Sequence, residues 1–279
     1  MVTILELPRE IRDLIYMAVF NSELSPPASP AECRHDRNQI SSEYGPSEYF
    51  GEHCNHYPME PVSISCSGLL LTCRQVRAEV LDVIARLKVQ NQLQYKIDCI
   101  IEDERFFFPT WLSVPVVSFD IDTVEVSFRV FGQRNGRCGF TPGDGGPSFL
   151  IWSLFALLNR FLERGPNFLS PFKSRQKINV KLITLNIVTP TEPTEGFIPE
   201  DWQRSYSRTT GVIHPKTVLR SIQSELNSLL QKTRYTTKYA TTVYNGVHRV
   251  KLMLDGEIKM EWDLVAMESE RQKAIGSST

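Results

Sequence analysis

The chain has 279 residues, of which 41% are hydrophobic and 23% charged, and its formal net charge is −1. These proportions are typical of a globular protein long enough for one large domain or two. A charge so close to zero provides no general attraction to nucleic acid or to anionic lipid, so neither is expected as a partner.

The sequence gives no sign of export or of membrane insertion. Glu6 and Arg9 interrupt the apolar start that a signal peptide would need. The longest uncharged run, residues 145–159, contains glycine and proline and is too short to span a bilayer. The six cysteines have no paired spacing, which indicates reduced thiols rather than a disulfide framework. We therefore expect an intracellular protein, either cytoplasmic or nuclear.

A Leu-Pro step near the N-terminus predicts the first helix, because proline is suited to a first helical turn. Apolar residues then recur at i, i+3, i+4, i+7 and i+8, which is the pattern of a single buried stripe. The charged residues between them are expected to face water. The predicted stripe consists of Ile11, Leu14, Ile15, Ala18 and Val19, and the charged positions are Arg9, Glu10, Arg12 and Asp13.

A helix of this length is marginal alone, so its stripe needs something to pack against. One alternative is that the stripe packs on the body of its own chain, as most apolar stripes do. The other is that Leu5, Leu7 and Pro8 project into the groove of a partner protein. The sequence alone leaves both alternatives open.

The next segment, residues 21–65, contains six prolines and lacks sustained periodicity, which predicts a long loop or mobile insert. Its cysteines and histidines are conceivable zinc ligands, but no C-x2-C or H-x3–5-H pair is present. We therefore favour a loop and expect no metal and no other cofactor. The residues considered are Cys33, His35, His53, Cys54 and His56, with Cys66 directly after the segment.

A second helix is predicted over residues 68–89, with charged residues on its outer side. Because acidic residues are interleaved with Arg74 and Arg77, this side is expected to be a solvated or ion-paired face rather than a phosphate site. The buried stripe is expected to consist of Val76, Val80, Val83, Ile84 and Leu87.

Two sequence strings carry a resemblance to a known family. LPREI at residues 7–11, followed by Leu14 and Ile15, resembles the first helix of an F-box. Together with LLLTCRQVRAEV at residues 69–80, it resembles a large group of fungal F-box-like proteins. This resemblance implies that residues 1–90 form an F-box-like helical region that binds a Skp1-like subunit, and that the rest of the chain captures a substrate for ubiquitination. The partner-binding residues would be Leu5, Leu7, Pro8, Ile11 and Ile15.

Beyond the second helix the apolar period changes from 3.6 to 2, which indicates β-strands. The first strand alternates from Leu93 to Ile101, with Asp98 among the residues on its solvated face. The aromatic residues 106–108 and Trp111 are expected in the core rather than on an exposed stacking surface. Another strand is predicted over residues 124–130.

The glycine-rich residues 132–147 lie between a strand and a helix, a position that suits phosphate binding. No GKS, GKT or G-x-G-x-x-G pattern is present, so a flexible surface loop is favoured over a nucleotide site. A buried helix capped by Ser148 is expected to extend to residue 165. Residues 178–188 predict a central strand covered on both faces and parallel to the strand before that helix.

The C-terminal third is predicted to contain a linker, a helix and a pair of turns. Residues 189–213 are expected to form the linker, and an amphipathic helix begins at Pro215. Asn245-Gly246 and Asp255-Gly256 are typical of type I′ hairpin turns, which predicts an antiparallel β-meander with one wet face. The polar residues 267–279 are expected to be frayed.

No catalytic signature such as G-x-S-x-G or H-E-x-x-H is present, so we expect a non-catalytic protein. The predicted fold class is α+β. F-box-like helices over residues 1–90 are followed by a sheet domain over 91–266, with a mixed sheet, two long helices and the meander. The chain is then either an adaptor between a Skp1-like subunit and a substrate protein, or a globular binding module of unknown ligand. In the second case the first helix is packed internally and has no link to ubiquitin ligases. A third alternative, an enzyme, would need a deep pocket with convergent ionisable groups.

Overall fold

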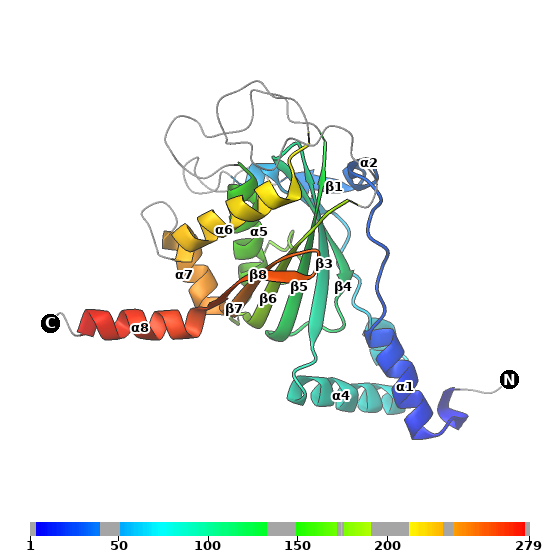
Figure 1. The fold of residues 1–279 in the computed structure, drawn as a ribbon. Coiled ribbons are helices and arrows are strands. Elements are labelled where there is room, and N and C mark those ends of the chain that lie inside the picture. Colours follow the sequence, from blue (N-terminus) through cyan, green and yellow to red (C-terminus); the bar gives the residue numbers. More distant parts are fainter. Residues whose placement is uncertain are drawn as a thin grey trace.

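A six-stranded mixed sheet organises the chain, with strand order β4-β3-β5-β6-β7-β8 (Figure 1). The four inner strands run parallel, while β4 and β8 pair antiparallel at the two edges. The strands are β3 (Gln94–Glu102), β4 (Phe106–Ser113), β5 (Asp120–Phe131), β6 (Asn179–Val188), β7 (Val247–Leu254) and β8 (Glu257–Asp263). The computed structural model describes residues 4–39, 51–132, 149–171, 174, 176–190, 212–230 and 237–276.

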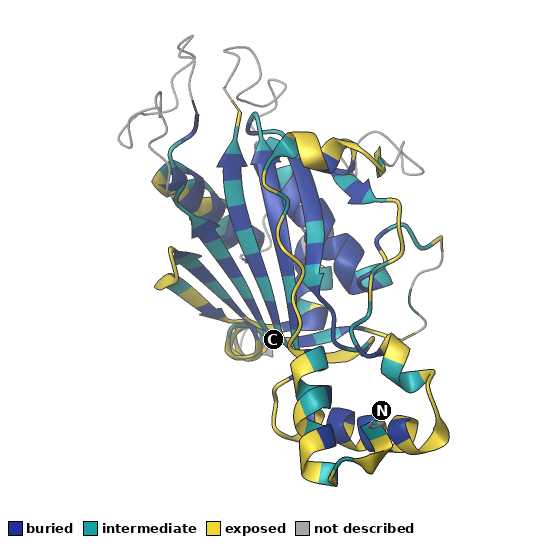
Figure 2. Ribbon diagram, turned by 90° about the vertical axis from the view of Figure 1, so that its right-hand side faces the viewer, coloured by how far each residue is buried: buried dark blue, intermediate teal, exposed yellow. Residues whose placement is uncertain are grey.

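One face of the sheet is covered by helices α5 (Phe149–Arg164), α6 (Pro215–Leu230) and α7 (Thr237–Gly246) (Figure 1). The main hydrophobic core lies between these helices and the strands. Along β5, β6 and β7 the buried residues mainly alternate, so these strands have one fully covered side (Figure 2). Helix α8 (Leu264–Gly276) follows β8 directly.

The predicted α+β class is confirmed by this mixed sheet and its helices. The strand–helix–strand unit over β5, α5 and β6 is also confirmed, because β5 and β6 are parallel neighbours. The expectation that residues 178–188 are covered on both faces is wrong. Along β6, Val180, Ile183, Leu185 and Ile187 are buried, while the residues between them are half-buried or exposed. The strand is therefore central but has only one fully covered face.

Of the predicted C-terminal meander, the structure contains one antiparallel hairpin, formed by β7 and β8. Asp255 and Gly256 have φ angles of 50° and 81°, as a type I′ turn between β7 and β8 requires. Asn245-Gly246 is not a turn, contrary to the prediction, because it forms the last residues of α7. Helix α8 also extends into the tail over which the sequence predicts fraying, and residues 277–279 lie outside the described part.

The segment over residues 21–65 is not a loop throughout, contrary to the prediction. Its described part contains helix α2 (Pro30–Arg34), strand β1 (Arg37–Gln39), the 3-10 helix η2 (Glu52–Cys54) and strand β2 (His56–Pro58). Strands β1 and β2 form a small antiparallel sheet. Cys33, Cys54 and Tyr57 are buried, so this segment contributes to the core.

Residues 21–29, here named the strap, lie across the face of the sheet opposite the helices (Figure 2). The backbone N–H of Leu24 donates to the carbonyl of Leu112 at 2.8 Å, and the guanidinium of Arg129 donates to the carbonyl of Pro27 at 2.5 Å. Arg129 also donates two hydrogen bonds of 2.7 Å to Asp98. Asp98 is therefore buried rather than solvated, which corrects the expectation for its side of β3.

Four elements form a separate helical module at one end of the sheet (Figure 1). The predicted single helix over residues 68–89 is divided in two, because Cys73 has an extended backbone with φ −141° and ψ 167°. The predicted stripe of the second helix is buried, as expected, and packs with Tyr16 and Phe20. The module consists of η1 (Ile4–Glu6), α1 (Arg9–Phe20), α3 (Ser67–Leu70) and α4 (Arg74–Val89).

Among the described residues, no helix has both the length and the apolar character that crossing a bilayer requires.

Candidate protein-docking surface on the first helix

Helix α1 begins at Arg9, directly after Pro8. The carbonyl of Pro8 accepts the backbone N–H groups of Ile11 and Arg12 at 3.1 Å, which starts the helical hydrogen-bond pattern. Before it, the N–H of Leu7 donates to the carbonyl of Ile4 and closes the short 3-10 turn η1. The Leu-Pro step therefore joins two helical segments at a corner, and it exposes Pro8 there.

The face of α1 that packs on the chain is not the predicted one. Its buried residues are Arg12, Tyr16 and Phe20, which follow one another at intervals of four. The predicted stripe points elsewhere: Ile11 is 44% exposed and Leu14 66% exposed. Ala18 is also exposed, whereas Ile15 and Val19 are half-buried. An apolar strip of α1 is thus left open to solvent.

A buried ion pair explains this orientation. The guanidinium of Arg12 donates to both carboxylate oxygens of Glu79 on α4, at 2.9 and 2.6 Å. The hydroxyl of Tyr16 donates to the same carboxylate at 2.8 Å, and Gln75 donates to it at 3.1 Å. A buried charge needs such partners, and a carboxylate can accept several donors. The sequence gives one signal of this arrangement, the i, i+4, i+8 spacing of Arg12, Tyr16 and Phe20.

A second set of charges holds α1 against α4 at the surface. Asp13 accepts hydrogen bonds of 2.7 Å from Arg9 on its own helix and from Arg86 on α4. Arg12 also donates to the carbonyl of Leu7 at 2.5 Å and so ties the Leu-Pro corner to the helix. These contacts fix the direction in which the open strip of α1 points.

The network predicts an acid-dependent loss of stability. The hydrogen bond from Arg12, aided by those from Gln75 and Tyr16, lowers the pKa of Glu79 to about 2. An unfolded glutamate has a pKa of about 4.3. Because the folded pKa is the lower one, the contribution of Glu79 to folding is fully present above that value and is lost as the pH falls toward 2.

This prediction is checked by urea unfolding of the wild type and of Glu79→Gln between pH 7 and pH 2. The wild type should have the higher midpoint at pH 7, and the difference should shrink steadily below pH 5. Burial raises the pKa of Glu52, which gives the opposite pH dependence, but Glu52 is the same in both proteins and cancels. If the difference between the two urea midpoints did not change with pH, the acid-dependent loss of stability could not be attributed to Glu79.

The five predicted partner-binding residues are not equally accessible. Leu5 is 42% exposed, and Ile11 and Pro8 are also exposed, whereas Leu7 and Ile15 are half-buried. Leu14, absent from the predicted set, is more exposed than either Leu5 or Ile11. We name Leu5, Pro8, Ile11 and Leu14 the outer face of α1. Helix α1 and the corner before it belong to the helical module, which extends away from the sheet (Figure 2).

The other candidate sites find no support in the described residues. No group of three or more His, Cys, Asp or Glu side chains there is placed to hold a metal ion. Cys33, Cys54 and Cys66 are buried, and burial raises the pKa of each thiol. The ring of His56 stacks on Phe108. Most of the glycine-rich linker, Ser148 and residues 191–211 of the second linker lie outside the described part.

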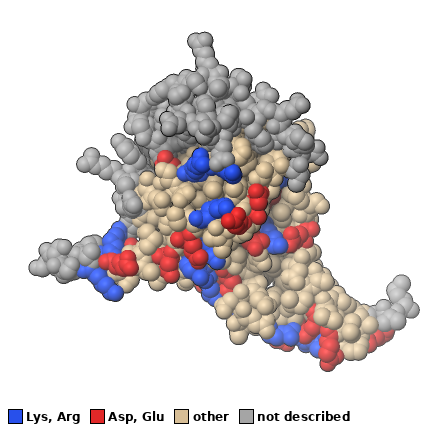
Figure 3. All heavy atoms as spheres, in the orientation of Figure 1, with Lys and Arg blue, Asp and Glu red and all other residues tan. Residues whose placement is uncertain are grey.

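Charges of both signs are mixed on the face seen in Figure 3. Figure 3 shows acidic and basic side chains interspersed on the face in view, including the helical module. On that face no large patch of one sign stands out among the described residues, which agrees with the formal net charge of −1.

Comparison with known protein families, with characterised proteins and with solved structures finds no match to this chain.

Proposed function

We propose that this chain is a protein-interaction adaptor that docks through the outer face of α1. A Skp1-like subunit is the proposed partner at this face, and the sheet domain presents a substrate protein for ubiquitination. The single observation that carries the proposal is the exposure of the apolar strip of α1, with Ile11 at 44% and Leu14 at 66%. Apolar side chains gathered on one side of a well-anchored helix are suited to a partner's groove.

The arrangement of the module supports the same proposal. In the sequence, the two strings that resemble the F-box-like proteins are separated by the segment over residues 21–65. In space, α1 packs on α4 through Arg12 and Glu79, so the two strings form one helical cluster. The long insert therefore does not prevent a compact unit of the kind that the resemblance implies. The proposed location, the cytoplasm or the nucleus, follows from this role.

The alternative is a globular binding module in which the first helix is internal. That hypothesis needs Leu7 and Ile11 to be packed beneath the chain's own helices and sheet. Leu7 is half-buried, but Ile11 is not, and Leu14 beside it is open. The apolar side chains that pack inward from this region are instead Tyr16 and Phe20, with Ile4 and Met17 partly buried against them. Exposure of the strip thus favours a docking role over an internal one.

A pull-down with purified Skp1 tests the proposal. We expect the wild type to be captured, and we expect Leu7→Ala/Pro8→Ala to bind more weakly because the corner before α1 is altered. The sharper variant is Ile11→Asp/Leu14→Asp. It places charges on the outer face without touching the buried network, and its affinity should fall at least about tenfold.

The matched control is Leu24→Asp, because Leu24 is 58% exposed but lies on the strap. It should bind as the wild type does, and all variants should retain the wild-type melting temperature within a few degrees. Failure of the wild type to bind Skp1 would end the proposal. Equal losses in Leu24→Asp and Ile11→Asp/Leu14→Asp would show that binding does not use the outer face.

A further inference from the structure

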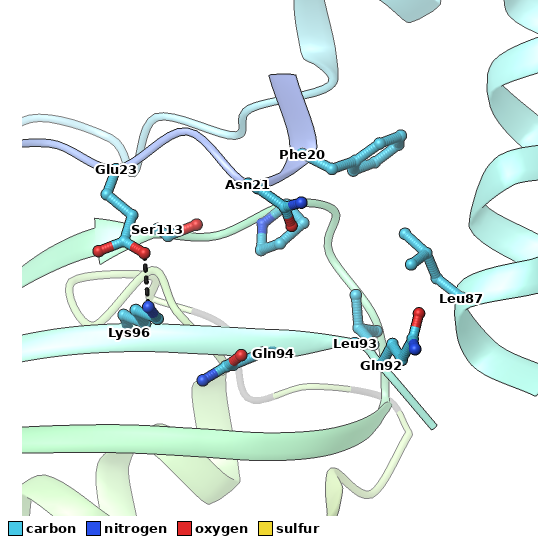
Figure 4. Close-up of a pocket in the computed structure, with 10 residues that line it drawn as sticks. Phe20, Asn21, Glu23, Leu87, Gln92, Leu93, Gln94, Lys96 and Ser113 are labelled. Atoms are coloured by element: carbon cyan, nitrogen blue, oxygen red, sulfur yellow. Dashed lines mark hydrogen bonds and ion pairs between the residues drawn. The ribbon is translucent and has the colours of Figure 1, made fainter. Parts of the chain in front are cut away.

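A cavity of about 160 Å³ lies where the helical module meets the sheet. The end of α1, the start of the strap, α4 and strands β3 and β4 all contribute to its lining (Figure 4). A single water molecule needs roughly 10–15 Å³ of such space, whereas pockets for drug-sized ligands begin at about 300 Å³. The cavity therefore fits a group the size of one amino-acid residue.

Three neutral carboxamides line this cavity. Asn21 follows α1, Gln92 lies in the connection from α4 to β3, and Gln94 is the first residue of β3 (Figure 4). Within the described part of the chain, none of their side chains hydrogen-bonds to another protein group; Asn21 and Gln92 are exposed and Gln94 is half-buried, so all three are accessible to a ligand. Each carboxamide carries one acceptor oxygen and an NH2 group with two donor hydrogens. Together they match the N–H and C=O groups of a peptide unit.

The charges at the cavity cancel one another. Lys96 forms an ion pair of 2.5 Å with Glu23 (Figure 4), and its nitrogen also lies 3.8 Å from a carboxylate oxygen of Glu125. Among the described residues that line the cavity, no cation is therefore left over to compensate a phosphate or a carboxylate, whose burial would be costly. Because its charged side chains are already paired, the lining of the cavity favours a neutral ligand over an anionic one.

The remaining wall is apolar. Phe20 and Leu87 belong to the core of the helical module, and Leu93 belongs to the core of the sheet. All three are buried yet reach the cavity. A ligand with a small apolar group would contact both cores at once.

We propose that this cavity binds one apolar residue of an extended peptide segment. The side-chain amides of Asn21, Gln92 and Gln94 hydrogen-bond the peptide groups, and Phe20, Leu87 and Leu93 contact the apolar side chain. The site is separate from the outer face of α1 and does not depend on the proposed docking there. The proposed role of the cavity between the helical module and the sheet is therefore to bind a neutral peptide segment.

The test uses the purified full-length chain without any partner. The probe is N-acetyl-L-leucine N′-methylamide, which has two peptide groups and one apolar side chain, and its binding is followed by NMR titration. We expect saturable binding, and at least about tenfold weaker binding of the corresponding aspartate derivative. Adenosine is included because carboxamides also pair with base edges. Tighter binding of adenosine would overturn the proposal, as would the absence of saturable binding of the leucine derivative.

Variants locate the site. Asn21→Ala/Gln94→Ala removes hydrogen bonds from surface-accessible side chains and should weaken binding at least about tenfold. Asn21→Trp should abolish binding by filling the cavity. Gln90→Ala is the matched control, because Gln90 is exposed on the same connection but does not line the cavity. Unchanged binding in the double variant and in Asn21→Trp would refute the site.

Ile11→Asp/Leu14→Asp should bind the leucine derivative as the wild type does. Failure of this proposal and failure of Skp1 capture are thereby distinguishable.

Discussion

Replacing Gly51 by alanine should destabilise the folded chain by about 3 kcal/mol, as severe overpacking does. A Cβ at this position would lie 1.9 Å from the carbonyl oxygen of Trp152 and 2.6 Å from the backbone nitrogen of Ser153. Both atoms belong to the backbone of α5, so no side chain can turn away to make room. The φ of Gly51 is −76°, which suits any residue, and the whole effect therefore comes from the close approach.

The same contact holds the segment after Gly51 on α5. The side-chain amide of Asn55 donates to the carbonyls of Gly51 and Ser153 at 3.0 and 3.1 Å. A Cβ at Gly51 would push this buried segment away from α5 and break these hydrogen bonds. Urea unfolding checks the prediction through the loss of stability. For a chain of this size the melting temperature should also fall by roughly 6–12 °C.

Gly68→Ala is the matched control for this prediction. Gly68 lies in helix α3, and a Cβ there would meet no atom within 4 Å. Alanine is favoured over glycine in a helix, so this variant should be unchanged or up to about 1 kcal/mol more stable. Equal stabilities of the two variants would mean that the segment after Gly51 does not pack on α5 as described.

Replacing Glu79 by alanine should release α1 from α4. The substitution leaves the guanidinium of Arg12 and the hydroxyl of Tyr16 without their shared acceptor inside the module. Leaving one partner of a buried ion pair uncompensated is strongly destabilising. We expect amide hydrogen exchange in α1 to become at least about tenfold faster, with little change in the central strands of the sheet.

Asp82→Ala provides the comparison, because Asp82 lies on the same helix with its side chain 70% exposed. Its only described ion pair is a 3.7 Å contact with Arg9, and surface pairs of this kind contribute little. Exchange in α1 should therefore stay near the wild-type rate. Similar rates in Glu79→Ala and Asp82→Ala would show that the buried carboxylate does not orient the helix. Skp1 capture should fall in Glu79→Ala if docking needs an anchored α1.

The sheet could be predicted from the sequence because its signal is local. Alternation with period 2 identified β3 and β5, and the Asp255-Gly256 turn identified the hairpin of β7 and β8. The helix between β5 and β6 indicated their parallel pairing. Along β3 and β5 the pattern is repeated over many residues, so neighbouring positions support one another, whereas the turn is identified by two adjacent residues alone.

The orientation of α1 could not be predicted from its apolar stripe. The prediction assumes that the apolar side chains of an amphipathic helix face the core. In α1 the face that packs on α4 instead contains Arg12, which pairs with Glu79. The acceptor lies 67 residues away from Arg12, and no local pattern identifies the two as partners. The exposed strip that defines the candidate site follows from this distant contact.

Similar reasons explain the other errors. Asn245-Gly246 is favoured in hairpin turns, but Ala240 and Val243 are buried at helical spacing and place these residues at the end of α7. The proline-rich segment over residues 21–65 has no period, yet single buried residues such as Cys33 and Tyr57 anchor it. Such isolated anchors depend on the tertiary structure and leave no pattern in the sequence.

The separation of 67 positions between Arg12 and Glu79 also bears on how the protein is made. At synthesis rates of about 5–20 residues per second, α1 emerges from the ribosome roughly 3–13 s before α4 does. During that interval both the apolar strip of α1 and the face that later packs on α4 are uncovered, because α1 is made before the helix that supplies its buried acceptor. Completion of α4 ends the interval by covering one of the two faces.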